Sequence, residues 1–185
     1  MADLTHNNLS LKGQLLLADP KLREPTFCQS VLLLTEHSDE HGALGFILNR
    51  PFGKSVGEFL PDLEFEELKD APVFMGGPVS TEHLTFAALG WSEMESKLQF
   101  ATHLSGNEAM MYQMEGFEIR AYVGYSGWSE GQLESELEQK TWIIHEAEKI
   151  VIDAKRAEQL WRDILREISP WYRIVADEPD DTSMN

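Results

Sequence analysis

Cysteine is nearly absent from the sequence, which has Cys28 alone among 185 residues. A single cysteine excludes an internal disulfide and a cysteine-based zinc site. Long apolar runs are also missing: residues 1–10 are polar, unlike a signal peptide, and no stretch approaches the ~20 apolar residues that span a bilayer. We therefore expect a cytosolic protein without a membrane segment.

Positively charged residues are also scarce. The chain has 15 lysines and arginines against 32 aspartates and glutamates, so its formal net charge is −17. Such a charge repels phosphate backbones and anionic lipid. The cations of residues 155–166 alternate with acidic residues, as on the solvated face of a helix. Direct nucleic-acid binding is not expected, and the expected partner is an unknown protein or a small ligand.

The length of the chain suits a single domain. Folding at this size buries roughly 70% of the unfolded surface, which is enough for stability without disulfides or metals. We expect one domain over residues 1–176. Residues 177–185 are acidic and rich in turn-forming residues, with no apolar periodicity, so this tail is expected to be mobile.

The order of secondary structure indicates an α+β protein. Serine–glutamate pairs at Ser55 and Ser105 are capping boxes that predict helix starts, and a three- and four-residue apolar stripe predicts a helix from Asp153 to Ser169. Strands and helices do not alternate regularly, which favours α+β over a doubly wound sheet. Short apolar runs predict strands at 13–18, 31–35, 43–49, 73–75, 84–89, 98–102 and 117–125, and two further short apolar runs stand at 141–144 and 150–152.

Residues 124–137 form the most organised segment, which we interpret as a strand-to-helix joint. With Ser129 as the N-cap, Gln132 falls at the third helical position and completes a capping box. Trp128 and Leu133 then occupy the two positions of a hydrophobic staple. Glutamates 134, 136 and 138 are expected to face water.

Two interpretations of this joint stay open. Capping and packing explain nearly every residue type in it without any chemistry. Alternatively, its glycines and its helix N-terminus form a cleft with free amides for a polar or anionic ligand. Tyr125, Trp128 and Gln132 would line that cleft.

Five strings follow one another in the sequence: 13–18 with Pro20, 30–34 followed by Glu36 and His37, 42–51, 76–79 and 124–134. In this order they give the chain a resemblance to the AlgH/YqgE family of bacterial proteins. The resemblance implies a compact α+β fold, a mixed β-sheet with a small barrel-like core flanked by helices. It implies no accepted reaction; one member is named for a regulatory link to alginate production, which implies a regulatory role without showing contact with DNA. The chain has Ala88-Leu89 where members carry a Leu-His pair.

Other short patterns resemble functional motifs but miss a required element. Residues 53–55 look like the end of a P-loop, yet Leu48 stands where its first glycine belongs. Ser126 follows Gly124 as in a nucleophile elbow, but the second glycine comes one residue early. His37 and His41 flank a predicted hairpin turn, where an ordinary polar turn is favoured over a zinc site.

Two functions of different classes remain. The first is a binding or regulatory module. The alternative is a small-molecule enzyme such as a hydrolase, with His37 as general base and the Gly76-Gly77 amides as an oxyanion site. No catalytic set, metal site or cofactor is assigned. The candidate binding residues for either function are His37, Asn49, Arg50, Gly76, Gly77, Tyr125, Trp128 and Gln132.

Overall fold

The computed structural model describes residues 10–60 and 66–177. Most of the predicted acidic tail, 178–185, lies outside the described residues. The strands are β1 (Leu15–Ala18), β2 (Val31–Ser38), β3 (Gly42–Ile47), β4 (Pro51–Ser55), β5 (Pro72–Met75), β6 (Val79–Ser92), β7 (Lys97–Leu104), β8 (Glu118–Trp128) and β9 (Trp142–His145).

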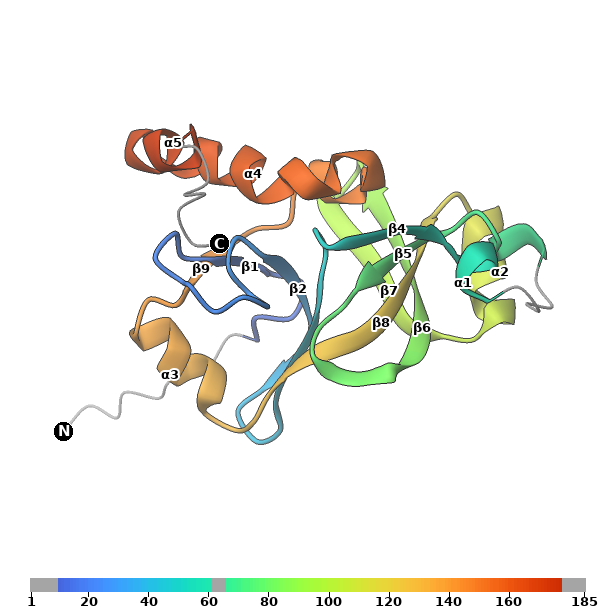
Figure 1. The fold of residues 1–185 in the computed structure, drawn as a ribbon, viewed down its shortest axis with the longest axis horizontal. Coiled ribbons are helices and arrows are strands. Elements are labelled where there is room, and N and C mark those ends of the chain that lie inside the picture. The colour runs from blue at the N-terminus through green and yellow to red at the C-terminus, as the bar shows by residue number, and fades with distance from the viewer. Residues whose placement is uncertain (1–9, 61–65, 178–185) are drawn as a thin grey trace.

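Helices lie outside the sheet, on more than one side of it (Figure 1). The long C-terminal helix expected from residue 153 begins as a 3-10 segment and becomes α-helical only at Leu160. The α-helices are α1 (Val56–Phe59), α2 (Gly106–Met114), α3 (Gln132–Glu138), α4 (Leu160–Ile168) and α5 (Pro170–Asp177), and the 3-10 helices are η1 (Glu66–Leu68), η2 (Lys149–Ile152) and η3 (Ala154–Gln159).

The strands form one mixed, open sheet, which confirms the predicted α+β class. Its path runs β4-β5-β8-β3-β2-β1-β9, with β6 pairing to β8 and β7 to β6. The β5–β8 pair is parallel, and the other pairs are antiparallel. Because the path is open, the barrel-like core expected from the resemblance is not a closed barrel. Strand β8 joins the two halves of the sheet, since it pairs with β3, β5 and β6.

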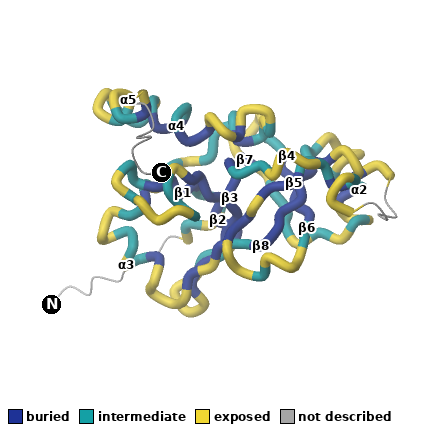
Figure 2. The backbone as a smooth tube through the Cα atoms, viewed as in Figure 1, coloured by how far each residue is buried: buried dark blue, intermediate teal, exposed yellow. Residues whose placement is uncertain are grey.

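Continuous apolar runs in β1 and β2 result from burial on both faces of the sheet (Figure 2). Leu15 and Leu17 belong to the core under α4, whereas Leu16 and Ala18 belong to the core under α3. The same alternation holds in β2. A strand covered by helices on both sides needs no polar face, and it therefore appears in the sequence as an unbroken apolar run.

The other half of the sheet contains a buried cation. Arg120 on β8 is fully buried; its Nε donates to Glu118 (2.8 Å) and its Nη2 to the carbonyls of Val151 and Ile152 in η2 (both 2.8 Å). These bonds fasten η2 to the sheet and satisfy carbonyls at a helix end. Burial raises the pKa of the neighbouring Tyr122 hydroxyl, against an opposing effect of Arg120.

The two predicted capping boxes are confirmed at α1 and α2. The backbone N–H of Ser55 donates to the carboxylate of Glu58, and that of Ser105 donates to Glu108, both at 2.8 Å. Hydrogen bonds from the serine backbone lower the pKa of Glu58, and bonds from the Ser105 side chain and backbone lower that of Glu108. Each carboxylate is thus held in its charged form at a helix N-terminus.

Glycines allow the chain after β5 to cross β8 in direct backbone contact. A Cβ on Gly77 would lie 2.3 Å from the carbonyl carbon and oxygen of Tyr125, and one on Gly76 would lie 2.3 Å from Gly124 O. Gly124 itself has φ +68, in the left-handed region that favours glycine. We call this contact of residues 76–77 with residues 124–126 the glycine crossing. Backbone atoms cannot move aside as a flexible side chain can, so the crossing requires glycine.

Substituting Gly77→Ala is therefore expected to destabilise the protein by ~3 kcal/mol or more, because the new methyl group would overlap main-chain atoms. Gly116→Ala is the matched control: Gly116 also has positive φ (+91) but nothing within 4 Å of its Cβ position. The free energy of unfolding of this control should fall by only ~1–2 kcal/mol, which is the cost of holding alanine in the left-handed region. Urea unfolding measures the stability of both variants. Equal losses of stability would contradict the requirement for glycine at the crossing.

Candidate functional site

A cavity of about 620 Å³ lies between the β2–β3 hairpin and residues 125–128 of β8. We call it the hairpin groove. Three of the predicted candidates, His37, Tyr125 and Trp128, line it together. They come together because β3 pairs with the end of β8, with Ala43 opposite Trp128 and Gly45 opposite Ser126. Its other lining residues include Lys12, Glu36, Ser38, His41, Leu44 and Val79.

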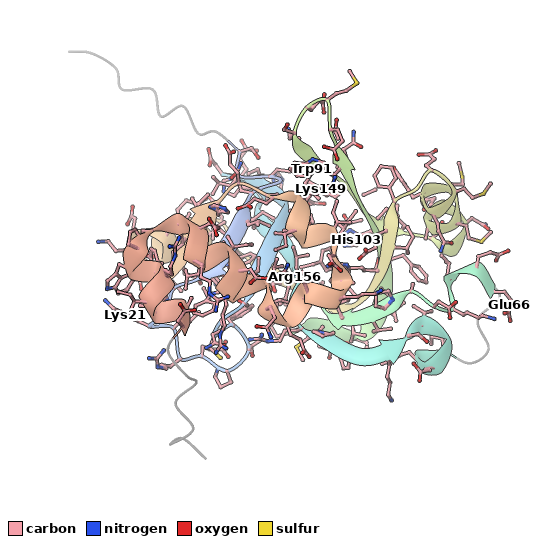
Figure 3. The ribbon with its side chains drawn as sticks, turned by 90° about the horizontal axis from the view of Figure 1, so that it is seen from above. Lys21, Glu66, Trp91, His103, Lys149 and Arg156 are labelled. Atoms are coloured by element: carbon pink, nitrogen blue, oxygen red, sulfur yellow. The ribbon has the colours of Figure 1, made fainter. Side chains whose placement is uncertain are left out.

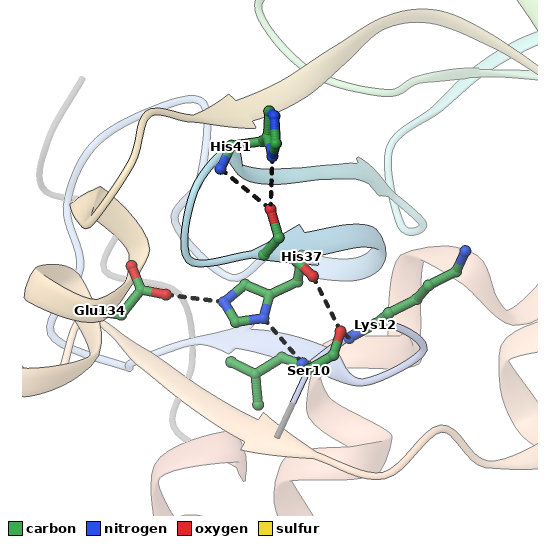
Figure 4. A network of polar contacts seen from close by, with 7 residues as sticks. Ser10, Lys12, His37, His41 and Glu134 are labelled. Carbon is green, nitrogen blue, oxygen red and sulfur yellow. Dashed lines mark hydrogen bonds and ion pairs between the residues drawn. The ribbon is translucent and has the colours of Figure 1, made fainter. Parts of the chain in front are cut away.

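His37 is held at both ring nitrogens (Figure 4). Its Nδ1 accepts a hydrogen bond from the backbone N–H of Leu11 (3.0 Å), and its Nε2 lies 2.8 Å from Glu134 Oε1. Since an amide can only donate, Nδ1 is the acceptor and Nε2 carries the proton that points to Glu134. The ring therefore joins the strand β2, the segment before β1 and helix α3.

This arrangement leaves His37 without a free nitrogen for proton transfer to a ligand. Its side chain is only 6% exposed, and Ser10 Oγ also donates to its carbonyl oxygen at 3.1 Å. A general base needs an acceptor atom within reach of the proton that it removes. The hydrogen-bonding pattern therefore fits a fastening residue better than a base.

Trp128 is fixed by a carboxylate that it shares with a second tryptophan. Both indole N–H groups, of Trp128 (2.9 Å) and Trp142 (2.7 Å), donate to Oε2 of Glu136. The other oxygen of Glu136 accepts from Gln132 Nε2 at 2.9 Å. The two indole rings pack edge to face with centroids 6.2 Å apart. Buried indoles need a hydrogen-bond acceptor, and Glu136 supplies it for both.

Two predictions about the joint are wrong. The N-cap of α3 is Gly131, with φ +71, and not Ser129. Ser129 lies in the turn before the helix: its carbonyl accepts from Gln132 N (3.0 Å), and its own N–H donates to the Gln132 side chain (3.1 Å). Nor do Glu134 and Glu136 simply face water, because His37 and the two indoles recruit their carboxylates. Trp128 and Leu133 do share one apolar cluster, as a staple requires.

Asn49 and Arg50 do not join the residues that line the groove; both bind backbone at residues 28–31, in the loop before β2 and at the first residue of that strand. Asn49 is buried, with Oδ1 accepting from Val31 N and Nδ2 donating to Gln29 O, both at 2.8 Å. Arg50 donates from Nη2 to the carbonyl of Cys28. An asparagine that satisfies one donor and one acceptor of the main chain acts as a structural bridge.

Gly76, Gly77 and Ser126 belong to the glycine crossing. The Gly76 amide donates to Val123 O at 2.9 Å, so this N–H is not free to stabilise an oxyanion. Ser126 Oγ is buried and donates to Gly76 O at 3.1 Å, which is a bond that fastens two strands rather than the exposed hydroxyl of a nucleophile. His41 contacts Ser38, and no cluster of three metal-ligating side chains exists within the described parts of the chain.

A family model described as AlgH-like matches residues 15–173. The chain belongs to the AlgH-like family. Among its relatives are a UPF0301 protein of Streptomyces coelicolor, 36% identical with 95% of this chain and 96% of the relative covered, and one of Parabacteroides distasonis, 32% identical with 98% and 96% covered. Bacterial relatives are thus matched over nearly their whole length.

Two solved structures share the AlgH-like fold. The solution structure of the AlgH protein from Pseudomonas aeruginosa is 27% identical, with a TM-score of 0.64 and with 97% of this chain and 98% of that chain covered. The crystal structure of protein DIP2367 from Corynebacterium diphtheriae is 19% identical, with a TM-score of 0.68 and coverage of 93% and 94%. Within residues 10–60 and 66–177, no helix has the length and apolarity to cross a bilayer.

Sequence reasoning missed several residues of this site in the AlgH-like chain. Glu134 lies 97 residues from His37, and Lys12 and Val79 reach the groove only through strand pairing. One usable signal existed. Trp128 and Trp142 flank α3, and buried indoles of this kind need an acceptor, which a nearby glutamate could supply.

Replacing His37 with phenylalanine should leave the Leu11 amide and the Glu134 carboxylate without their partner, at a cost of about 1–3 kcal/mol. Glu134→Gln keeps an acceptor oxygen and should cost less than ~1 kcal/mol. His41→Phe serves as the control at an exposed position, where a change within ~0.5 kcal/mol is expected. Chemical unfolding compares the three. Similar stabilities for the His37 and His41 variants would refute the fastening role.

Proposed function

We propose that this AlgH-like protein is a binding module of regulatory rather than catalytic function, and that the hairpin groove holds a small ligand. The observation that carries the proposal is the convergence of three separate segments, β2, β6 and β8, on one cavity of about 620 Å³. Ligand sites in proteins commonly have volumes of ~300–1,000 Å³. Local capping of α3 alone does not require such a convergence.

The lining of the groove supports a small ligand that is both polar and partly aromatic or apolar. Tyr125, Leu44 and Val79 provide apolar surface, while Lys12 and His41 provide cationic or hydrogen-bonding groups. No ion pair involves Lys12 within the described residues. A ligand carboxylate or phosphate is the natural partner for such a lysine.

The alternative, a hydrolase, has less support. Both ring nitrogens of its proposed base, His37, and the amide of Gly76 already form hydrogen bonds within the protein, as does the hydroxyl of Ser126. An enzyme would have to break these bonds before it reached a substrate. A binding role leaves them in place.

The rest of the proposal concerns the setting. We place the protein in the cytoplasm, where its formal charge of −17 favours recognition of a protein or a small ligand over direct contact with DNA. Its regulatory effect would then pass through ligand binding and through a protein partner.

The groove can be tested by filling it. A set of small carboxylates, phosphates and aromatic amides is added to ¹⁵N-labelled protein, and we expect amide shifts at Lys12, Tyr125 and Gly127. Val79→Trp should abolish these shifts, because a larger side chain at this lining position occupies the cavity. Ile174→Trp, at an exposed position on α5, is the control and should retain them. The proposal fails if no compound shifts these amides or if the shifts survive in the Val79 variant.

A further inference from the structure

Strand β7 has one edge that pairs with no strand in the described residues. Its eight residues pair with β6 on one side, from Phe86 opposite Leu104 to Ser92 opposite Lys97. In an antiparallel ladder, alternate residues point their N–H and C=O groups away from the partner strand. The outer edge of β7 therefore presents a row of backbone donors and acceptors, which is the arrangement that recruits a further strand.

This edge opens into a second cavity, of about 760 Å³, which we call the edge groove. Residues 97–102 of β7 form one wall, and Thr35 and Glu36 of β2, with the segment 10–13, contribute to the other. Seen from above, the β6–β7 hairpin that carries Trp91 projects from the body of the molecule (Figure 3). The six wall residues of β7 span ~20 Å at ~3.3 Å per residue, which suits an extended peptide rather than a compact small molecule.

The side chains of the edge groove supply apolar contacts at its base. Phe100, Tyr112 and Phe117 line it, and the last two pack edge to face with ring centroids 5.1 Å apart. Phe100 lies 3.6 Å from the Cβ position of Gly13, so it closes the floor between the two walls. A bound strand directs alternate side chains to this floor and to solvent.

The charge of the edge groove is opposite to that of the whole chain. Its charged lining residues are Lys12, Lys97 and Glu36. Neither lysine has an ion-pair partner among the residues that the structure describes, although acidic residues outnumber basic ones by 32 to 15 in the sequence. Two unneutralised cations along a backbone edge complement an acidic peptide.

We propose that the outer edge of β7 binds an extended, acidic segment of a partner protein by strand addition. The backbone of the segment pairs with β7, its apolar side chains contact Phe100 and the Tyr112–Phe117 pair, and its carboxylates face Lys12 and Lys97. Main-chain hydrogen bonds supply affinity in this mode of recognition, and the side-chain contacts supply specificity. The edge groove is distinct from the hairpin groove, although the two share Lys12 and Glu36.

The probe is a fluorescein-labelled mixture of eight-residue peptides that alternate glutamate with valine, isoleucine, tyrosine or phenylalanine. Fluorescence anisotropy with the full-length protein should show saturable binding. A matched mixture with lysine in place of glutamate should bind at least tenfold more weakly. Lys97→Glu should weaken the binding of the acidic mixture at least tenfold. Lys155→Glu is the control: it makes the same change of charge at an exposed position without an ion pair in the described chain, and it should leave binding unchanged.

Backbone pairing is tested with two versions of the tightest-binding peptide, each N-methylated at one of the two alternating sets of residues. Methylation removes the amide protons on one edge of the peptide, so at least one version should lose binding tenfold or more. If both methylated versions bind as tightly as the parent peptide, strand addition is overturned. The acidic peptide is overturned as the occupant if the acidic mixture shows no saturable binding. It is also overturned if the protein is a dimer in solution that Lys97→Glu converts to a monomer. Val79→Trp fills the hairpin groove and should leave peptide binding intact, which separates this test from that of the small-ligand site.

Discussion

The direct backbone contact between residues 76–77 and residues 124–126 determines how the two halves of the sheet meet. Because the chain crosses β8 there, β5 ends its parallel pairing at Met75–Val123 and β6 begins with Val79 opposite Tyr125. The end of β8 is then free to pair with β3, which brings the β2–β3 hairpin beside it. The hairpin groove is a consequence of this exchange of partners. A side chain larger than hydrogen at Gly77 would separate the two halves.

Polar groups around the crossing are used for assembly. Ser126, His37 and Glu136 each form hydrogen bonds to elements that are distant in the chain or that begin a helix. Lys12, which has no ion pair among the described residues, lines both grooves.

Local patterns were sufficient to predict much of the fold. Unbroken apolar runs predicted β1 and β2 because both of their faces are covered, and the serine–glutamate pairs predicted α1 and α2 because capping depends on neighbours three residues apart. Resemblance to the family identified the mixed α+β fold. Local patterns also placed His37, Tyr125 and Trp128 among the candidates that the structure brings to one groove.

Long-range pairing explains what the sequence left unpredicted. Glu134 and Glu136 look like solvent-facing helix residues until β2 and β9 bring an imidazole and a second indole to them. Asn49 and Arg50 end a strand, as many binding residues do, but here they bridge to the loop before β2. The N-cap of α3 moved to Gly131 because a turn at residues 129–132 precedes the helix. None of these partners is visible within a window of local sequence.

The imidazole of His37, the amide of Gly76 and the hydroxyl of Ser126 are committed to hydrogen bonds within this AlgH-like protein, and we propose that its two grooves provide recognition instead. The tautomer of His37 tests this most directly, because a committed ring has its proton on Nε2 and accepts from Leu11 at Nδ1. Long-range ¹H–¹⁵N correlation spectra of the neutral ring should show a protonated Nε2 and a hydrogen-bonded, unprotonated Nδ1. A proton on Nδ1, or fast exchange between the two tautomers as in a free imidazole, would contradict the account.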